Sequence, residues 1–192
     1  MSKVVIAGDA SGTGTFTISA PNGNTDRTLV LPDEAGTVLT TAGVPASAMP
    51  AGSVLQTVYN SYTAWTTTTN TGFVATGLTA SITPTASNSK ILIQINANGI
   101  YNSSTSGAVH FALYKNAALL TYLDWDLSYG VVNYGASGAY AYLDLPSTTS
   151  STTYTLYWKS LSGASIGINN YAGAGSNDGN TKSSIVLTEI AG

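Results

Sequence analysis

The chain has 192 residues, a formal net charge of −3 and only 8% charged residues, against about 25% in a typical soluble domain. Its six lysines and arginines are scattered over the whole length, which argues against nucleic-acid binding through a basic cluster. The absence of cysteine excludes a disulfide scaffold, thiol catalysis and a cysteine zinc site.

The N-terminal segment Met1–Gly8 has too short an apolar run for a signal peptide. Nowhere does an apolar run approach the ~18 residues that a membrane helix needs. We therefore expect a soluble chain that is made in a cytoplasm and does not insert into a membrane.

Short, broken strands are predicted in the first fifty residues. Gly12–Ser19 and Arg27–Thr41 each form short apolar stretches closed by Pro, Asn and Gly turns, and isolated hairpins of this kind are marginal in water and leave unpaired edges. The following Gly43–Gly52 is rich in proline and small residues and indicates a linker. We expect residues 1–50 to be an attachment and oligomerisation arm whose strands are completed by other chains.

The remaining residues, 51–192, are predicted to form a β-sandwich head. In Lys90–Ala97 an isoleucine recurs at every second position, which is typical of a half-buried strand. About eight to ten such strands, spaced by turn signals every 8–12 residues, predict an antiparallel sandwich or jelly roll. The same alternation recurs in Val109–Tyr114, Tyr154–Lys159 and Ser184–Ile190.

Groups that could carry out catalysis are scarce. The single histidine, His110, lies in the middle of a predicted strand, so we expect no enzyme activity and no cofactor. Asp124 and Asp126 flank Trp125 and would share one strand face, as a carboxylate pair, a calcium site or a solvated edge face with Trp125 packed inward. We favour the solvated face, because calcium takes about six to eight oxygen ligands, and we expect no metal. A glycan depolymerase would have to use this pair.

Aromatic residues crowd the segment from 120 to 172 among small polar neighbours, a composition that suits adaptable recognition surfaces and stacking against sugars. The alternative is that many of them fill the core or a subunit interface. The candidate recognition residues are Tyr122, Trp125, Tyr129, Tyr134 and Tyr171.

Two parts of the chain, the N-terminal segment and the head, resemble known proteins. GTGTFTISAPNGNTDRTLVLPDEAGTVLTTAG, followed by ASAMPAGSVLQTV, resembles the N-terminal part of bacteriophage tail fibres and related virion appendage proteins. SKILIQINANGIY, VHFALYKNAAL and SSIVLTEIAG look like strands of a jelly-roll head of the tumour-necrosis-factor or complement globular-head type.

This resemblance implies an all-β, homotrimeric virion structural protein, located in the virion after assembly in the host cytoplasm. It would be a tail-fibre or receptor-binding appendage that meets a glycan or protein of the host surface. The alternative is a capsid decoration (cement) or head-fibre protein. In both cases residues 1–50 would bind other virion proteins.

Overall fold

The computed structural model describes residues 11–13, 23, 28, 44, 46–130, 132, 135–169 and 181–192. The chain divides into two units, Met1–Val38 and Leu39–Gly192, and all described strands belong to the second. The predicted strands of the arm lie outside the described residues. The arm and its boundary near residue 50 therefore stay predictions.

The described part of the second unit is all-β, with no α-helix and a single 3-10 turn, η1 (Ala46–Ala48). Its ten strands agree with the eight to ten predicted from turn spacing. They are β1 (Val54–Tyr62), β2 (Thr66–Thr68), β3 (Val74–Ile82), β4 (Lys90–Asn102), β5 (Val109–Lys115), β6 (Ala118–Leu127), β7 (Ala136–Asp144), β8 (Thr152–Ser160), β9 (Ile166–Ile168) and β10 (Ser183–Ile190).

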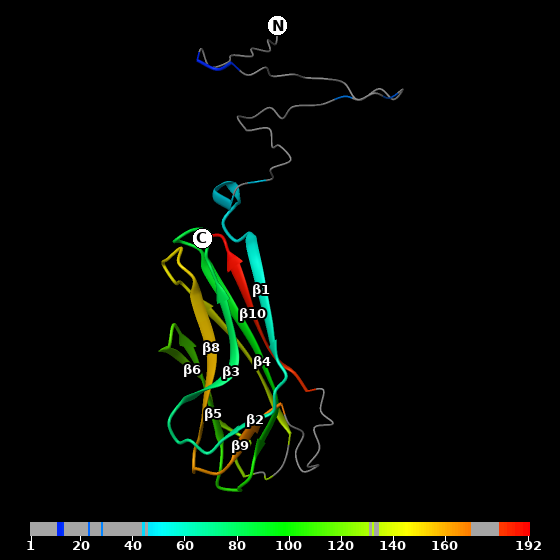
Figure 1. The fold of residues 1–192 in the computed structure, drawn as a ribbon, viewed down its shortest axis with the longest axis vertical. Helices are drawn as coiled ribbons and strands as arrows, with labels where there is room; N and C mark the ends of the chain where they lie inside the picture. Colours follow the sequence, from blue (N-terminus) through cyan, green and yellow to red (C-terminus); the bar gives the residue numbers. More distant parts are fainter. Residues whose placement is uncertain are drawn as a thin grey trace. The chain divides into compact units, whose positions relative to one another are not determined.

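The strands form two antiparallel sheets that face each other (Figure 1). One has the order β1-β10-β4-β9-β2, with β7 also paired to β4, and the other the order β3-β8-β5-β6. Without the three-residue strands β2 and β9, the order is β1-β10-β4-β7 in one sheet and β3-β8-β5-β6 in the other. Consecutive strands change sheet except at the β5–β6 hairpin, which is the double Greek-key order. This is the jelly-roll sandwich, and the predicted fold class is confirmed.

The core lies between the sheets and follows the predicted alternation. In β4, Ile91, Ile93 and Ile95 are buried, while Gln94 and Asn96 are exposed on the other face. Strands β8 and β10 alternate in the same way. Burial of apolar side chains from both sheets is the main favourable term in folding. The largest fully buried side chains include Leu78, Ile100, Phe111, Tyr154, Leu156 and Trp158.

A buried carboxylate, Asp144 at the end of β7, ties the two sheets together. The Lys115 ammonium of β5 lies 3.1 and 3.0 Å from its two oxygens, and the Tyr154 hydroxyl of β8 donates to it at 2.7 Å. Burial and this hydrogen bond raise the pKa of Tyr154, so the hydroxyl stays a donor. The three side chains form a satisfied polar network inside the sandwich.

A second buried carboxylate, Glu189 on β10, has only neutral partners. The backbone N–H and the hydroxyl of Thr85 donate to its Oε1 at 2.7 and 2.8 Å, and the Gln56 amide donates to its Oε2 at 2.6 Å. Burial acts to raise the pKa of Glu189, but these hydrogen bonds outweigh burial and the pKa is lowered. The charged carboxylate thus fastens the loop after β3 to β1 and β10.

Replacing Glu189 by Gln is expected to lower the free energy of unfolding at pH 7 by about 1–3 kcal/mol, because an amide cannot accept from all three donors. The pKa of Glu189 is lower in the folded protein than in the unfolded chain. The stabilisation that the carboxylate provides is therefore fully present above the unfolded-state pKa, and it is lost as the pH falls through the folded-state pKa. Urea unfolding of both proteins from pH 7 downward measures this. The two curves should converge in acid; a constant difference across that range would contradict the account.

Candidate recognition surface

The edge strand β6 carries two of the predicted recognition residues, and its pairing with β5 is irregular in three places. Tyr122 lies opposite Ala112, and Trp125 lies opposite His110. Directly opposite residues share a face of a sheet, so Tyr122 and Trp125 point to the same, outer face although they are three positions apart. Strict alternation would have placed the two side chains on opposite faces of the sheet, but the extra residue Leu123 forms a bulge that puts them on the same face.

Side chains from the loop before β3 and from β5, β6 and β8 meet on this outer face and form what we call the outer aromatic cluster. The rings of Tyr114 and Tyr157 stack with centroids 3.8 Å apart. Tyr122 meets Trp125 edge-on at 5.2 Å and Phe73 at 5.7 Å. Such ring contacts add to the free energy of area burial. The cluster consists of Phe73, His110, Tyr114, Tyr122, Trp125, Tyr157 and Lys159.

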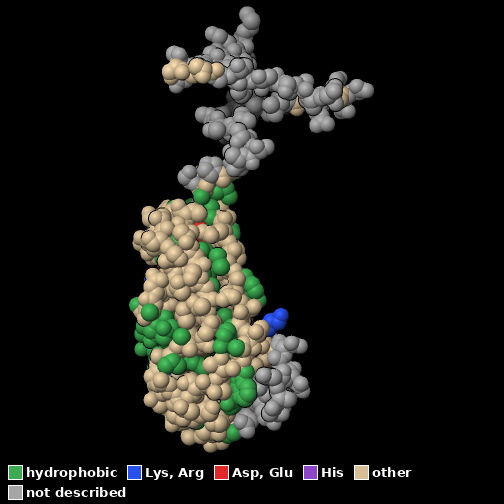
Figure 2. Space-filling view, in the orientation of Figure 1, with side chains coloured by type: hydrophobic (Ala, Val, Ile, Leu, Met, Phe, Trp, Pro, Cys, Tyr) green, Lys and Arg blue, Asp and Glu red, His purple; other side chains and the backbone are tan. Residues whose placement is uncertain are grey.

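The cluster has a buried floor and an exposed rim. Trp125 stacks on His110 with centroids 4.4 Å apart, and His110 is only 1% exposed although it lies on the outer face. Tyr122 and Trp125 themselves remain 54% and 50% exposed. Figure 2 shows hydrophobic side chains gathered at the left of the sandwich, where Figure 1 places β6. The face is therefore partly a packed layer and partly free aromatic surface.

Lys159 of β8 places its ammonium among these rings. Its Nζ lies 4.9 Å from the ring centroid of Trp125 and 5.1 Å from that of Phe73, within the range of cation–π attraction. In the described part of the chain the Lys115 ammonium pairs with Asp144, and His110 Nε2 lies 3.0 Å from an oxygen of Asp126. The Lys159 ammonium thus has aromatic neighbours and no carboxylate partner among the described residues.

The expected pairing of Asp124 and Asp126 on one face is wrong. Asp124 lies opposite the core residue Phe111 and accepts a hydrogen bond from Tyr140 at 2.9 Å, whereas an oxygen of Asp126 lies 3.0 Å from His110 Nε2. The extra residue at Asp126, with a φ of 139°, breaks the alternation. The expectation that Trp125 packs inward is wrong for the same reason.

The Tyr140 hydroxyl behaves as a structural donor. Burial, the hydrogen bond to Asp124 and its negative charge raise the pKa of Tyr140. Groups of three or more His, Cys, Asp or Glu side chains that could hold a metal ion do not occur among the described residues.

The other predicted recognition residues have mixed outcomes. Tyr129 is exposed in the turn after β6, where its N–H donates to the Asp126 carbonyl at 3.2 Å. Tyr134 and Tyr171 lie outside the described residues. The sequence reasoning missed Phe73, Tyr114, Tyr157 and Lys159. Alternation within β5 and β8 could have placed the last three on one face, but Phe73 precedes β3 in a loop and carries no such signal.

The outer face of the opposite sheet differs in character, and we call it the neutral face. Its side chains are small, polar or aliphatic, and its exposed aromatic is Tyr59. Two lysines lie beyond the two ends of the neutral face: Lys90 at the start of β4 and Lys182 directly before β10. From the strand registers the neutral face consists of Thr57, Tyr59 and Ser61 on β1, Ser184, Val186 and Thr188 on β10, Leu92, Gln94, Asn96 and Asn98 on β4, and Ser137, Ala139, Ala141 and Leu143 on β7.

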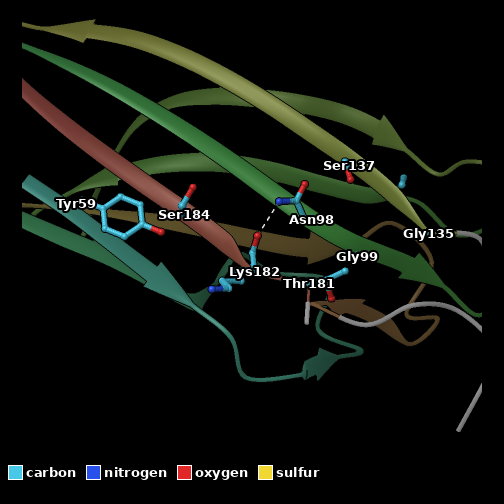
Figure 3. A pocket seen from close by; sticks show the side chains of 9 residues that line it. Tyr59, Asn98, Gly99, Gly135, Ser137, Thr181, Lys182 and Ser184 are labelled. Atoms are coloured by element: carbon cyan, nitrogen blue, oxygen red, sulfur yellow. Dashed lines mark hydrogen bonds between the residues drawn. The ribbon is translucent and has the colours of Figure 1, made fainter. Parts of the chain in front are cut away.

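A pocket of about 530 Å³ opens at one end of the neutral face. Figure 3 shows Tyr59, Ser184 and Ser137 around it, with Asn98 near its middle. The Asn98 amide donates to the Lys182 carbonyl at 2.7 Å, which joins β4 to the start of β10. The lining is uncharged apart from Lys182, and nothing in the sequence analysis predicted it.

No protein-family model matches the chain, and no curated protein sequence matches it. Among solved structures, it is similar to the crystal structure of the infectious bursal disease virus VP2 subviral particle, with 11% sequence identity and a TM-score of 0.42. The match covers 73% of this chain and 34% of that chain, so this chain spans about a third of the VP2 chain. The described part of the chain contains no helix with the length and hydropathy to span a bilayer.

The strand order and the two outer faces define the class of protein: an all-β jelly-roll sandwich with an aromatic face and a neutral face.

Proposed function

We propose that the chain is a bacteriophage virion structural protein, a tail-fibre or receptor-binding appendage that meets the host surface through the outer aromatic cluster. The observation that carries this proposal is the convergence of half-exposed Tyr122 and Trp125 on one sheet face. Exposed aromatic groups of this kind are enriched at the centres of binding sites. The resemblance of about residues 8–58 to phage appendage proteins supports the same function.

Self-association through the neutral face completes this proposal. A sheet face without charges can pack against copies of itself with little cost of desolvating ions, and charged residues are depleted at interface cores. We take the occupant to be further copies of this chain, in a trimer. Three sandwiches joined in this way would leave their aromatic faces free for the host.

Replacing Ala141 by Glu is expected to break the trimer, because each copy would bring a carboxylate into an uncharged interface. Sedimentation of the wild-type chain should give about three times 19.6 kDa, and the variant should sediment as a monomer. Ser81 is exposed on β3 of the other sheet, so Ser81→Glu is a matched control that should remain trimeric. A monomeric wild type would overturn the proposed self-association.

The alternative function is a capsid decoration or head-fibre protein, in which residues 1–50 add strands to sheets of the shell. The strand-forming N-terminal part of the resemblance, which covers about residues 8–58, favours this second candidate. Particles that lack residues 1–50 should then become sensitive to heat or osmotic shock while adsorption is unchanged. A receptor-binding appendage predicts loss of adsorption with intact capsids.

Competition for adsorption tests the proposed function. The purified full chain, added to host cells before the phage, should occupy the receptor and slow phage adsorption in proportion to its concentration. Adsorption that stays unchanged at saturating protein would contradict the receptor-binding function.

A further inference from the structure

The Lys159 ammonium is the positively charged group of the outer aromatic cluster. Stacking of a ligand on the aromatic rings alone would leave this charge without a partner. It lies over two rings and pairs with no carboxylate in the described part of the chain. An ammonium has three N–H donors, and an aromatic face attracts the charge without accepting those bonds in the geometry that an oxygen offers. A ligand oxygen that carries a charge would complete the site.

A carboxylate contacts the same cluster through His110. Asp126 follows Trp125 directly and its side chain is 58% exposed, while one of its oxygens is held by His110 at 3.0 Å. No salt bridge joins Asp126 to Lys159. The Lys159 ammonium of β8 therefore contacts the Trp125 ring, and the Asp126 carboxylate of β6 contacts His110, on which Trp125 stacks.

This polarity suits one kind of occupant. A pyranose ring can stack its C–H face on an exposed aromatic ring, and its hydroxyls can donate to the Asp126 carboxylate. A neutral sugar would leave the Lys159 ammonium without an anionic partner. A sugar that bears a carboxylate would pair with Lys159 and direct its hydroxyls to Asp126, so that both charges would be used.

We infer that the outer aromatic cluster is a binding site for an acidic sugar, with Lys159 as the residue that selects for the carboxylate. This inference rests on the proposed recognition of the host surface and names the ligand class. Tyr122 and Trp125 contribute contact area, and Lys159 discriminates acidic from neutral sugars.

Two methyl glycosides that differ only at C6 test the inference: methyl glucuronoside, which has a carboxylate, and methyl glucoside, which has a hydroxymethyl group. The corresponding galacturonoside and galactoside form a second pair. Binding to the purified full chain is measured by ligand-detected NMR. We expect each acid to bind at least about tenfold more tightly than its neutral partner, since charge-assisted hydrogen bonds are about twice as strong as neutral ones.

Substitutions at Lys159 test whether this side chain causes the preference for acidic sugars. Lys159→Met keeps the aliphatic stem over the rings and should abolish the difference between acid and neutral sugar, while Lys159→Arg should retain it. Lys182 is a matched control, because it is exposed before β10, beyond the end of the neutral face and outside the outer aromatic cluster. Lys182→Met should leave the affinities for all four glycosides unchanged. The acid's affinity for the wild type should also fall with added salt, and its affinity for the Met variant should not.

Three results would overturn the inference: equal affinity for acid and neutral sugars, an acid preference that survives in Lys159→Met, or no binding of any of the four glycosides. None of these affects the proposed function as long as the full chain blocks phage adsorption. Conversely, failure of the adsorption competition with intact acid binding would reject the proposed function and leave the sugar site in place.

Discussion

Phage particles that carry both Tyr122→Ala and Trp125→Ala are expected to adsorb to host cells at least about thirtyfold more slowly, because central aromatic contacts of this kind contribute about 2 kcal/mol or more to binding. The two side chains supply much of the exposed area of the outer aromatic cluster. Truncation of Trp125 also uncovers His110, which is now 1% exposed. Adsorption rates of wild-type and variant particles give the measurement.

The control for this experiment is another half-exposed tryptophan. Trp65 is 48% exposed and lies between β1 and β2, so Trp65→Ala removes a similar side chain outside the cluster. It should leave adsorption unchanged. Circular dichroism and urea unfolding of each purified variant establish that the head is folded. Normal adsorption of the folded Tyr122/Trp125 variant would contradict the proposed recognition surface.

Replacing Asp144 by Ala is expected to lower the free energy of unfolding by about 2–3 kcal/mol, because the buried Tyr154 hydroxyl would lose its acceptor and the partly exposed Lys115 ammonium its carboxylate. Lys115 would lose both of its contacts to the carboxylate, and the buried Tyr154 hydroxyl would lose its acceptor. Urea unfolding at pH 7 and one fixed protein concentration gives the measurement, since association also contributes to apparent stability.

Two further variants distinguish the loss of the polar network from the loss of side-chain packing. Leu145→Ala removes an exposed neighbour and should change the free energy of unfolding by less than about 0.5 kcal/mol. The double variant Lys115→Met/Asp144→Leu replaces both charges by apolar groups and should recover part of the loss. An Asp144→Ala protein that loses less than about 1 kcal/mol would contradict the role of this network.

Sequence periodicity predicted the strands that form the middle of the sandwich. In β4, β8 and β10 one face is buried in the core and the other is not, so apolar side chains recur at every second position. The spacing of turns predicted a sandwich for the same reason. The three-residue strands β2 and β9 carry too few residues for any period and were not predicted.

The candidate site was predicted only in part, because it depends on departures from periodicity. The bulges in β6 decide that Tyr122 and Trp125 share a face and that Asp124 and Asp126 do not. A bulge depends on the partner strand, and one sequence does not reveal that register. Contacts such as Lys159 over Phe73 join segments separated by more than eighty residues, for which no local pattern exists.

Labelling of intact virions tests the central claim most directly. An antibody raised against the purified head, residues 51–192, is applied to purified particles of the phage that the proposal takes as the source of the chain, and bound antibody is located by electron microscopy. The account predicts label at the distal end of the tail and slower adsorption of the labelled particles. Particles that bind no antibody, while the same antibody recognises the purified chain, would contradict it.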